Sequence, residues 1–300
     1  MNELLEACPL CGSGNLQPRL RVRDKSVSQE TFVLDECRQC HFLFTNPRPD
    51  AASIGRYYES AAYVSHNSGA TGLINQVYKL ARFFTVRRKV RLITQLHGGR
   101  PGRLLDYGCG TGHFLAGAKA AGWQVTGLEP NDQARLDAAQ RVGQPILDAT
   151  ALPALPTASV DVLTLWHVLE HVHDLHETLD QLLATLQPAG QLVVAVPNAA
   201  SFDARHYGPN WAAYDVPRHL YHFTPATMRR LLEDHGLRVV QQLPMPLDAF
   251  YVSLLSEGQQ PVALRRSKLA ALRLAAQSNY HAARHGGDYS SLIYVAERPA

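Results

Sequence analysis

The sequence predicts an α/β protein with an open, mostly parallel sheet, preceded by a small domain built around four cysteines. Three observations predict this fold class. The 300 residues are 46% apolar, which is enough for one large core and excludes a wholly disordered chain. Two Cys-x-x-Cys pairs stand near the N-terminus. From residue 103 onward, short apolar runs alternate with helical stretches, and the first alternation contains a glycine-rich turn.

Charge and cysteine content narrow the class of protein. The chain has 29 basic and 26 acidic residues, and a net charge of +3 is too slight to argue for nucleic acid as a partner. The first residues lack the basic and apolar segments of a secretory signal, and no apolar run is long enough to span a membrane. We therefore expect a cytoplasmic protein whose cysteines stay reduced.

The N-terminal domain, residues 1–48, is expected to be a zinc ribbon. Its ligands would be two pairs with 25 residues between them, Cys8 with Cys11 and Cys37 with Cys40. Each pair can form a tight turn, and two such turns complete a tetrahedral site that leaves no position open for catalysis. Residues 20–22 and 31–34 predict short strands between the pairs. Two disulfides or four unrelated thiols are the alternatives, and His41 is a second-choice ligand.

Residues 49–98 predict a helical linker. A short helix is expected over residues 50–63 and a long amphipathic helix over residues 71–96. The apolar face of the long helix would comprise Leu73, Val77, Leu80, Phe84, Val90 and Ile93. Its basic residues, Arg87, Arg88, Lys89 and Arg91, are expected to form a solvated face.

The third domain, residues 99–300, opens with a strand, a glycine turn and a helix. The strand over residues 103–107 contains Asp106, and glycines follow at positions 108, 110 and 112. Such glycines let the backbone approach a ligand closely, and the following helix adds a positive dipole. A second strand ends at Glu129, at the distance where an acid holds a ribose diol. The leading Asp106 is wrong for a pyrophosphate but suits a cationic ligand such as S-adenosylmethionine.

The run Asp106-Tyr-Gly-Cys-Gly-Thr-Gly112 resembles the first motif of class I S-adenosylmethionine-dependent methyltransferases, and later landmarks extend the resemblance over about residues 85–245. It implies a Rossmann-like, seven-stranded sheet, mostly parallel, with helices on both faces, an antiparallel last strand and a helical insertion at about 247–288. It also implies a set of cofactor-binding residues: Asp106, Gly108, Gly110 and Gly112 in the loop, Glu129 at the ribose, and Asp148 with Ala149 at the adenine.

A histidine-rich segment follows the fourth predicted strand, in Trp166-His-Val-Leu-Glu-His171. If it turns helical, His167, Glu170 and His171 share one face. We expect His171 to be the catalytic base, with His167 second and Glu170 orienting a partner. The motif resembles that of ubiquinone-biosynthesis O-methyltransferases, some of which use a divalent metal here, so a second metal could bind near Glu170 and His171. The alternative is that Glu170 and His171 only brace the fold.

The segment 210–225 resembles a stretch in methyltransferases encoded with glycan pathways. The resemblance implies that aromatic, basic and histidine side chains of this segment contact a polar substrate: Trp211, Tyr214, Arg218, His219 and His222. A rigid aromatic loop docked on the core is the alternative. Residues 261–284 predict a basic amphipathic helix, which could cap the active site, contact a membrane surface peripherally, or be solvated.

Together these patterns predict an enzyme that moves a methyl group from S-adenosylmethionine to an oxygen of a polar small molecule or glycan. Two other functions stay open. One is a zinc-ribbon protein that binds or methylates RNA, and the low net charge argues against it. The other is a regulator that binds S-adenosylmethionine without catalysis.

Overall fold

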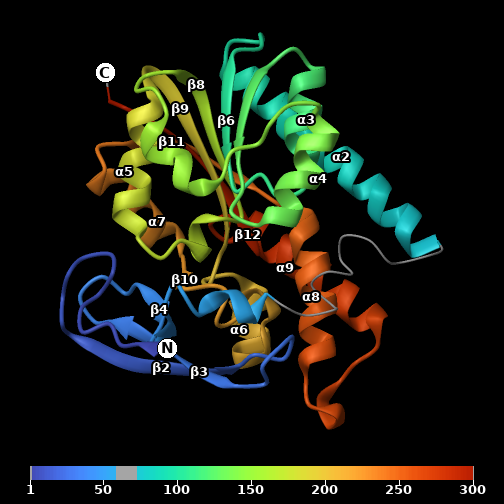
Figure 1. Ribbon diagram of the computed structural model, residues 1–300. Coiled ribbons are helices and arrows are strands. Elements are labelled where there is room, and N and C mark those ends of the chain that lie inside the picture. The colour runs from blue at the N-terminus through green and yellow to red at the C-terminus, as the bar shows by residue number, and fades with distance from the viewer. Residues whose placement is uncertain (1, 59–72, 300) are drawn as a thin grey trace.

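A computed structural model describes residues 2–58 and 73–299, with side chains from residue 82 onward in the first long helix. In the described residues the central sheet has six strands, in the order β11-β12-β9-β8-β6-β7 (Figure 1). Its strands are β6 (Arg103–Tyr107), β7 (Gln124–Leu128), β8 (Val160–Trp166), β9 (Leu186–Pro197), β11 (Arg238–Pro244) and β12 (Ser291–Glu297). The first four are parallel to one another, and β12 is antiparallel to both β9 and β11. The predicted fold class, with its antiparallel last strand, is confirmed.

The expected seventh strand is reduced to a single bridge between Leu128 and Leu147. The chain leaves the sheet at once because Asp148 caps a 3-10 helix, η2 (Ala149–Ala154), by accepting a hydrogen bond from the Thr150 N–H. The prediction of seven strands was therefore wrong by one strand at the β7 edge of the sheet.

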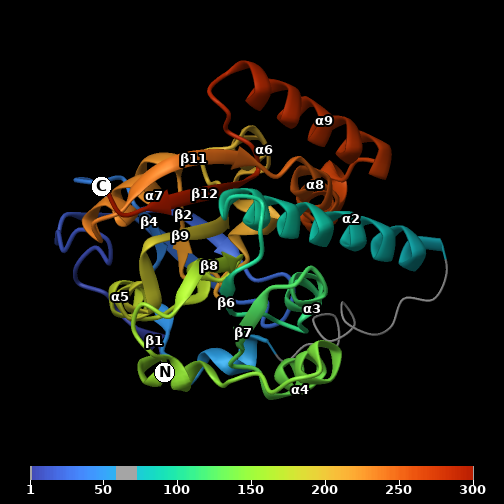
Figure 2. The ribbon, with the colours of Figure 1, turned by 90° about the horizontal axis from the view of Figure 1, so that it is seen from above.

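Helices cover both faces of the sheet. One layer contains α2 (Leu73–Leu96), α3 (His113–Ala120) and α4 (Asp132–Val142), and the other contains α5 (Leu175–Thr185) and α7 (Pro225–Asp234) (Figures 1 and 2). Strand residues alternate between the two cores: Leu104 packs with the first layer and Leu105 with the second. Helix α2 meets α3 through Val86 and Val90, which lie against Gly117. Phe84, expected on the buried face of α2, is exposed.

The N-terminal domain contains the antiparallel strands β2 (Leu16–Arg23), β3 (Thr31–Cys37) and β4 (Leu43–Thr45), as the ribbon prediction requires. A short ladder joins β1 (Asn2–Glu3) to β5 (Arg48–Pro49). A fourth strand of the ribbon sheet, β10 (Tyr221–His222), comes from the third domain and pairs with β4. The ribbon is therefore docked on the rest of the chain, and its sheet is completed by the segment predicted to contact substrate.

The linker after the ribbon forms a 3-10 turn, η1 (Ile54–Tyr57); the remainder of the predicted helix 50–63, from residue 59 on, lies outside the described residues. Two helices, α8 (Pro246–Gln259) and α9 (Lys268–Arg284), form a hairpin between β11 and β12. The single helix predicted over residues 261–284 is wrong at its start. Ser267 caps α9 instead, because its hydroxyl accepts the Ala270 N–H at 3.2 Å.

Short elements connect these units: η3 (Leu169–His171), α6 (Phe202–Tyr207), η4 (Gly208–Asn210), η5 (Ala212–Tyr214) and η6 (Val262–Leu264). Among the described residues, no helix has both the length and the apolar content needed to cross a membrane.

Candidate functional site

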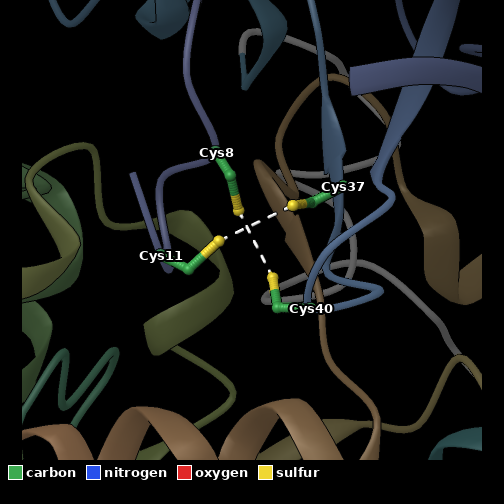
Figure 3. A group of neighbouring side chains, drawn as sticks. All are labelled: Cys8, Cys11, Cys37 and Cys40. Carbon is green, nitrogen blue, oxygen red and sulfur yellow. Dashed lines mark hydrogen bonds between the residues drawn. The ribbon is translucent and has the colours of Figure 1, made fainter. Parts of the chain in front are cut away.

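The four N-terminal cysteines converge on one point (Figure 3). The sulfurs of Cys8 and Cys40 lie 3.6 Å apart, as do those of Cys11 and Cys37. Disulfide sulfurs would be separated by about 2 Å, whereas sulfurs around a tetrahedral zinc ion lie about 3.8 Å apart. Gly12, at φ 72°, closes the first turn by donating its N–H to the Cys8 carbonyl. The donor set and geometry fit zinc.

Burial and local hydrogen bonds give the cysteine thiols different pKa values. Burial raises the pKa of Cys8 to about 11. Burial also opposes ionisation of Cys37, but backbone N–H groups of Cys40 and Gln39 outweigh it and lower the pKa of Cys37 to about 7. The fifth cysteine, Cys109, is buried in the glycine loop, where burial raises its pKa. This environment suits a space-filling role for Cys109.

The glycine loop at the end of β6 is arranged for close approach. Gly108 has φ 72°, and a Cβ there would lie 2.5 Å from Val168, so the loop and the segment after β8 are in contact. Gly112, also at positive φ, packs against Ala138 of α4. A Cβ on Gly110 would meet nothing within 4 Å, so this glycine faces open space. The loop thus offers free backbone surface between two tightly packed glycines.

Three carboxylates lie at or after the strand ends, as predicted. Asp106 is buried; it accepts the Thr164 hydroxyl at 2.6 Å, and burial raises its pKa to about 7. Glu129 accepts N–H groups of Gly110 at 2.8 Å and Asn131 at 3.0 Å. Asp148 immediately precedes Ala149, the first residue of η2. Its carboxylate accepts a hydrogen bond from the Thr150 N–H and lies 2.9 Å from the Arg135 guanidinium. Glu129 and the glycine loop are therefore tied together directly.

Lys89 was missed by sequence reasoning, which placed it on a solvated face of α2. Its ammonium lies 4.2 Å from the centre of the Trp166 ring and points into the site. Burial lowers the pKa of Lys89 to about 8, while Asp106 and Asp248 act in the opposite direction. Only the tertiary packing of α2 against the sheet could reveal this contact.

His167 is held as a cation between two acids. Its Nε2 lies 3.2 Å from Asp248 of α8 and its Nδ1 lies 3.6 Å from Glu170. Burial opposes its protonation, but these carboxylates outweigh burial and raise its pKa to about 9. His167 also has φ 59°, a conformation that few residues other than glycine adopt. Its charge and its strained backbone suit an electrostatic role better than that of a base.

Glu170, His171 and His219 bring their ligand atoms within 4.8 Å of one another. Glu170 is buried, and neither carboxylate oxygen has a hydrogen-bond partner among the described residues. His171 Nδ1 lies 2.9 Å from the Arg218 carbonyl, and His219 Nδ1 lies 2.9 Å from the Ala213 carbonyl. Because a carbonyl only accepts, both Nδ1 atoms carry a proton, and Nε2 is the ring nitrogen of each histidine left for a further partner. Sequence reasoning did not group His219 with the other two residues.

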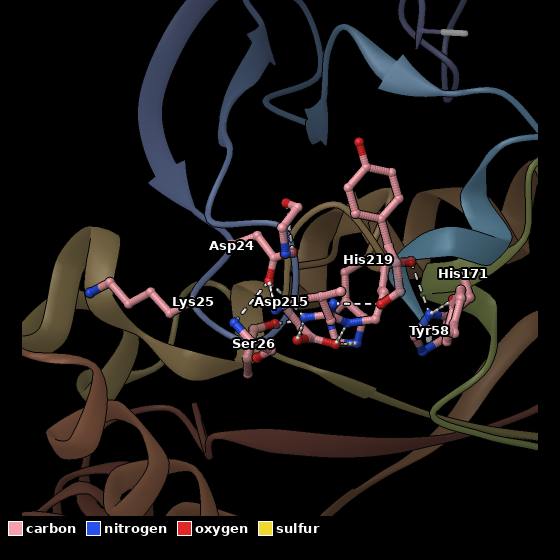
Figure 4. A network of polar contacts seen from close by, with 12 residues as sticks. Asp24, Lys25, Ser26, Tyr58, His171, Asp215 and His219 are labelled. Atoms are coloured by element: carbon pink, nitrogen blue, oxygen red, sulfur yellow. Dashed lines mark hydrogen bonds and ion pairs between the residues drawn. The ribbon is translucent and has the colours of Figure 1, made fainter. Parts of the chain in front are cut away.

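Ribbon and linker contact the part of segment 210–225 that carries Arg218 and His219 (Figure 4). Thr45 donates its hydroxyl to the His219 carbonyl at 2.8 Å, and Asp24 lies 3.4 Å from the Arg218 guanidinium. The Tyr58 hydroxyl lies 3.0 Å from His171 Nδ1. Ribbon and linker therefore set the positions of two of the three clustered side chains.

Most of the predicted substrate-contacting residues are buried. Trp211 donates its indole N–H to Asp203 at 2.9 Å, and Tyr214 packs edge-on against it. Arg218 is 2% exposed, and the side chain of His222 is enclosed beside Thr45. These four favour the alternative of a rigid loop docked on the core, whereas His219 joins the cluster.

A Rossmann-like sheet with a glycine loop and acids at its strand ends is the arrangement of class I S-adenosylmethionine-dependent methyltransferases, and it is shared with dinucleotide-binding enzymes. The methyltransferase-domain family model matches residues 79–242. The chain belongs to this family.

Curated relatives agree with this assignment. The chain is 29% identical over 166 residues to the ubiquinone biosynthesis O-methyltransferase of Cupriavidus pinatubonensis. The matched region covers 50% of this chain and 66% of the relative. It is 28% identical over 188 residues to the malonyl-[acyl-carrier protein] O-methyltransferase of Serratia marcescens, with 58% and 72% covered. The chain thus spans about two thirds of the length of these relatives.

Solved structures share the fold. A methyltransferase from Archaeoglobus fulgidus superposes with a TM-score of 0.51 at 20% identity, over 72% of this chain and 94% of that one. Magnesium protoporphyrin IX methyltransferase from Synechocystis, with bound SAH, superposes with a TM-score of 0.54 at 16% identity, over 83% and 100%.

Proposed function

We propose that this chain transfers the methyl group of S-adenosylmethionine to a hydroxyl oxygen of a polar small molecule or glycan. The observation that carries the proposal is the Glu170–His171–His219 cluster, in a segment that touches the glycine loop through Val168 and Gly108. Several curated relatives are named O-methyltransferases, which supports oxygen as the acceptor atom.

The residues around the glycine loop fit the cofactor. Gly110 borders open space, so the backbone can approach a ligand there. Asp106 would attract the positive charges of the methionyl end, Glu129 would accept hydrogen bonds from the ribose hydroxyls, and Asp148 with Ala149 would hold the adenine. Bound S-adenosylmethionine supplies an activated methyl group on a sulfonium. The chain's task is then to place an acceptor oxygen and to remove its proton.

His171 is the proposed proton acceptor. Burial and the neighbouring His219 lower its pKa to about 4, so it is neutral near pH 7, and its Nδ1–H bond to Arg218 leaves Nε2 free to accept. As a proton arrives, the buried Glu170 carboxylate, which keeps hydrogen-bonding capacity on both oxygens, would stabilise the imidazolium. His167 is already protonated at neutral pH, and we propose that it steadies the Glu170 charge.

The cluster also fits a divalent cation. Two imidazoles and one carboxylate are common metal ligands, and each imidazole is oriented by a backbone carbonyl in the manner of ligating histidines. Such a cation, when bound, would lower the pKa of a hydroxyl that contacts it. In the ribbon, we propose that Cys8, Cys11, Cys37 and Cys40 hold a structural zinc ion.

The test pairs cofactor binding with methyl transfer. Heat stabilisation by S-adenosylhomocysteine should be present in the wild type and in His171→Ala. With labelled S-adenosylmethionine, label should enter hydroxyl acceptors such as phenols and sugars, and His171→Ala should lower kcat about a hundredfold or more. His173→Ala is the matched control and should keep full activity. Label in RNA alone would overturn the acceptor assignment, and binding without any transfer would favour a regulator.

Metal analysis separates the two roles of the cluster. If a cation binds there, the wild type should contain one metal ion beyond the zinc, His219→Ala should lose only that ion, and Cys40→Ser should lose zinc. A wild-type content of one zinc ion per chain would leave His171 acting as a base alone.

A further inference from the structure

The connector between α8 and α9, taken together with the first two residues of α9 as residues 261–269, is exposed at every position. It lies at the end of the hairpin remote from the central sheet (Figure 1). Its apolar side chains face solvent: Val262 is 81% exposed, Leu264 63% and Leu269 56%. Val262 and Leu269 are among the exposed large apolar side chains of the described residues, and grouped side chains of this kind are typical of contact surfaces.

All charged side chains of residues 261–269 are positive. Arg265, Arg266 and Lys268 are exposed within the connector. The acid of this region, Glu257, is buried and accepts the Arg266 backbone N–H. Between residues 249 and 284, every exposed charged side chain is therefore basic.

The ribbon adds two more cations to the same place. Lys25 binds Asn210 and the Gln259 carbonyl at the end of α8. Burial, with the positive charges of Arg23 and Arg265, lowers the pKa of Lys25. Lys25 thus brings a further positive charge beside Arg265, and an anionic partner outside the chain would be attracted to both charges.

We propose that residues 261–269, which we call the hairpin tip, dock on an anionic lipid bilayer. Apolar side chains flanked by Arg and Lys suit the boundary between acyl chains and negatively charged headgroups. A second copy of the chain is the weaker occupant, because a two-fold interface between hairpin tips would bring together two surfaces whose exposed charges, Arg265, Arg266 and Lys268, are all positive. A nucleic-acid partner would account for the positive charges but not for the exposed apolar side chains of Val262 and Leu264.

The hairpin connects this surface to the candidate active site. Asp248, near the start of α8, contacts His167, and α8 ends at Gln259 beside the tip. At 1.5 Å of rise per residue, these two positions lie about 16 Å apart. A membrane-bound protein would therefore hold its acceptor site close to the bilayer, where acceptors with an apolar tail reside.

The experiment is vesicle flotation of the full chain. Vesicles of phosphatidylcholine alone are compared with vesicles that contain phosphatidylglycerol, at low and high salt. We expect binding only to the anionic vesicles, weakened by salt. Neutralising Arg265, Arg266 and Lys268 to Gln should weaken binding about a hundredfold. Val262→Ser with Leu264→Ser should also weaken it, while Leu136→Ser, an exposed residue of α4, should not.

Three outcomes would overturn the proposal. They are equal binding to both vesicle types, no binding to anionic vesicles, or a dimer in light scattering that disappears in the Val262→Ser/Leu264→Ser variant. A triple variant with Arg19, Arg100 and Arg229 changed to Gln controls for net charge and should float like the wild type. Stabilisation by S-adenosylhomocysteine should be unchanged in every variant, so failure of membrane binding and failure of the proposed methyl transfer are distinguishable.

Discussion

Asp24 of the ribbon and Arg218 of the loop before β10 form a buried ion pair, with 3.4 Å between Oδ1 and Nη2 (Figure 4). Arg218 also lies 2.6 Å from Asp215 and donates to the Tyr57 carbonyl at 2.9 Å. The guanidinium therefore joins the ribbon, the linker and the loop that carries His219. The position of a candidate catalytic side chain depends on a contact between segments almost 200 residues apart.

Arg218→Ala should lower the free energy of unfolding by about 3–5 kcal/mol, because it removes the buried cation that Asp24 and Asp215 share. Chemical denaturation measures the change. Arg230→Ala is the control, since Arg230 forms an exposed pair with Asp234 at 3.5 Å and its loss should change stability by about 0.5 kcal/mol or less. Equal effects would show that the Asp24 contact contributes little.

Removing the proposed zinc should loosen the candidate site. We expect chelation, or Cys37→Ser with Cys40→Ser, to lower the melting temperature by about 10 °C. Because β4 pairs with β10, amide hydrogen exchange should rise over residues 219–222 as well as in the ribbon. Cys109→Ala should retain zinc and protection. Exchange that rises only in the ribbon would contradict the coupling.

Cofactor affinity should depend on pH through Asp106. Its pKa is raised to about 7 by burial, so the carboxyl is charged above pH 7 and neutral below it. Since the charged form attracts the cationic methionyl end, the affinity for S-adenosylmethionine should fall by up to about tenfold per pH unit below pH 7. Calorimetric titration measures this fall. In Asp106→Asn the affinity should be weak and flat over the same range, and an unchanged inflection would exclude Asp106.

Gly108→Ala should abolish cofactor binding and destabilise the fold by about 2–4 kcal/mol, because the new Cβ would be both strained at positive φ and 2.5 Å from Val168. Gly143→Ala separates these causes. Gly143 has φ 70° but meets nothing within 4 Å, so its substitution should cost about 1 kcal/mol and leave cofactor binding intact. Equal losses would show that the contact with Val168 is unimportant.

His167 should stabilise the fold when it is protonated and its partners Asp248 and Glu170 are ionised. Its contribution should therefore be larger at pH 6 than at pH 10. Its folded pKa of about 9 exceeds the ordinary value of 6.5, so its contribution is full below about 6.5 and disappears as the pH rises through 9. His167→Gln should therefore lower stability by about 2 kcal/mol at pH 6 and by little at pH 10. Denaturation at the two pH values tests this, and a difference that does not shrink at pH 10 would contradict a charged His167.

The sequence by itself located the candidate site residues that lie close together in the chain. Two Cys-x-x-Cys pairs, three glycines after an acid, and Glu129 at the end of the next strand each depend on spacing within a short segment, so pattern alone located them. The family resemblance implied the mostly parallel sheet with its antiparallel last strand, but neither the strand lost where Asp148 begins η2 nor the late start of α9.

Tertiary structure decided which distant residues meet. Strand pairing between β4 and β10 placed the ribbon against the loop and brought His219 to Glu170 and His171. Packing of α2 and α8 turned Lys89 and Asp248 into the site, and burial converted Arg218 and Trp211 from expected substrate contacts into buried ion-pair and hydrogen-bond partners. Such contacts join segments far apart in the chain, and their geometry arises from the combined packing of both domains, which no local pattern encodes.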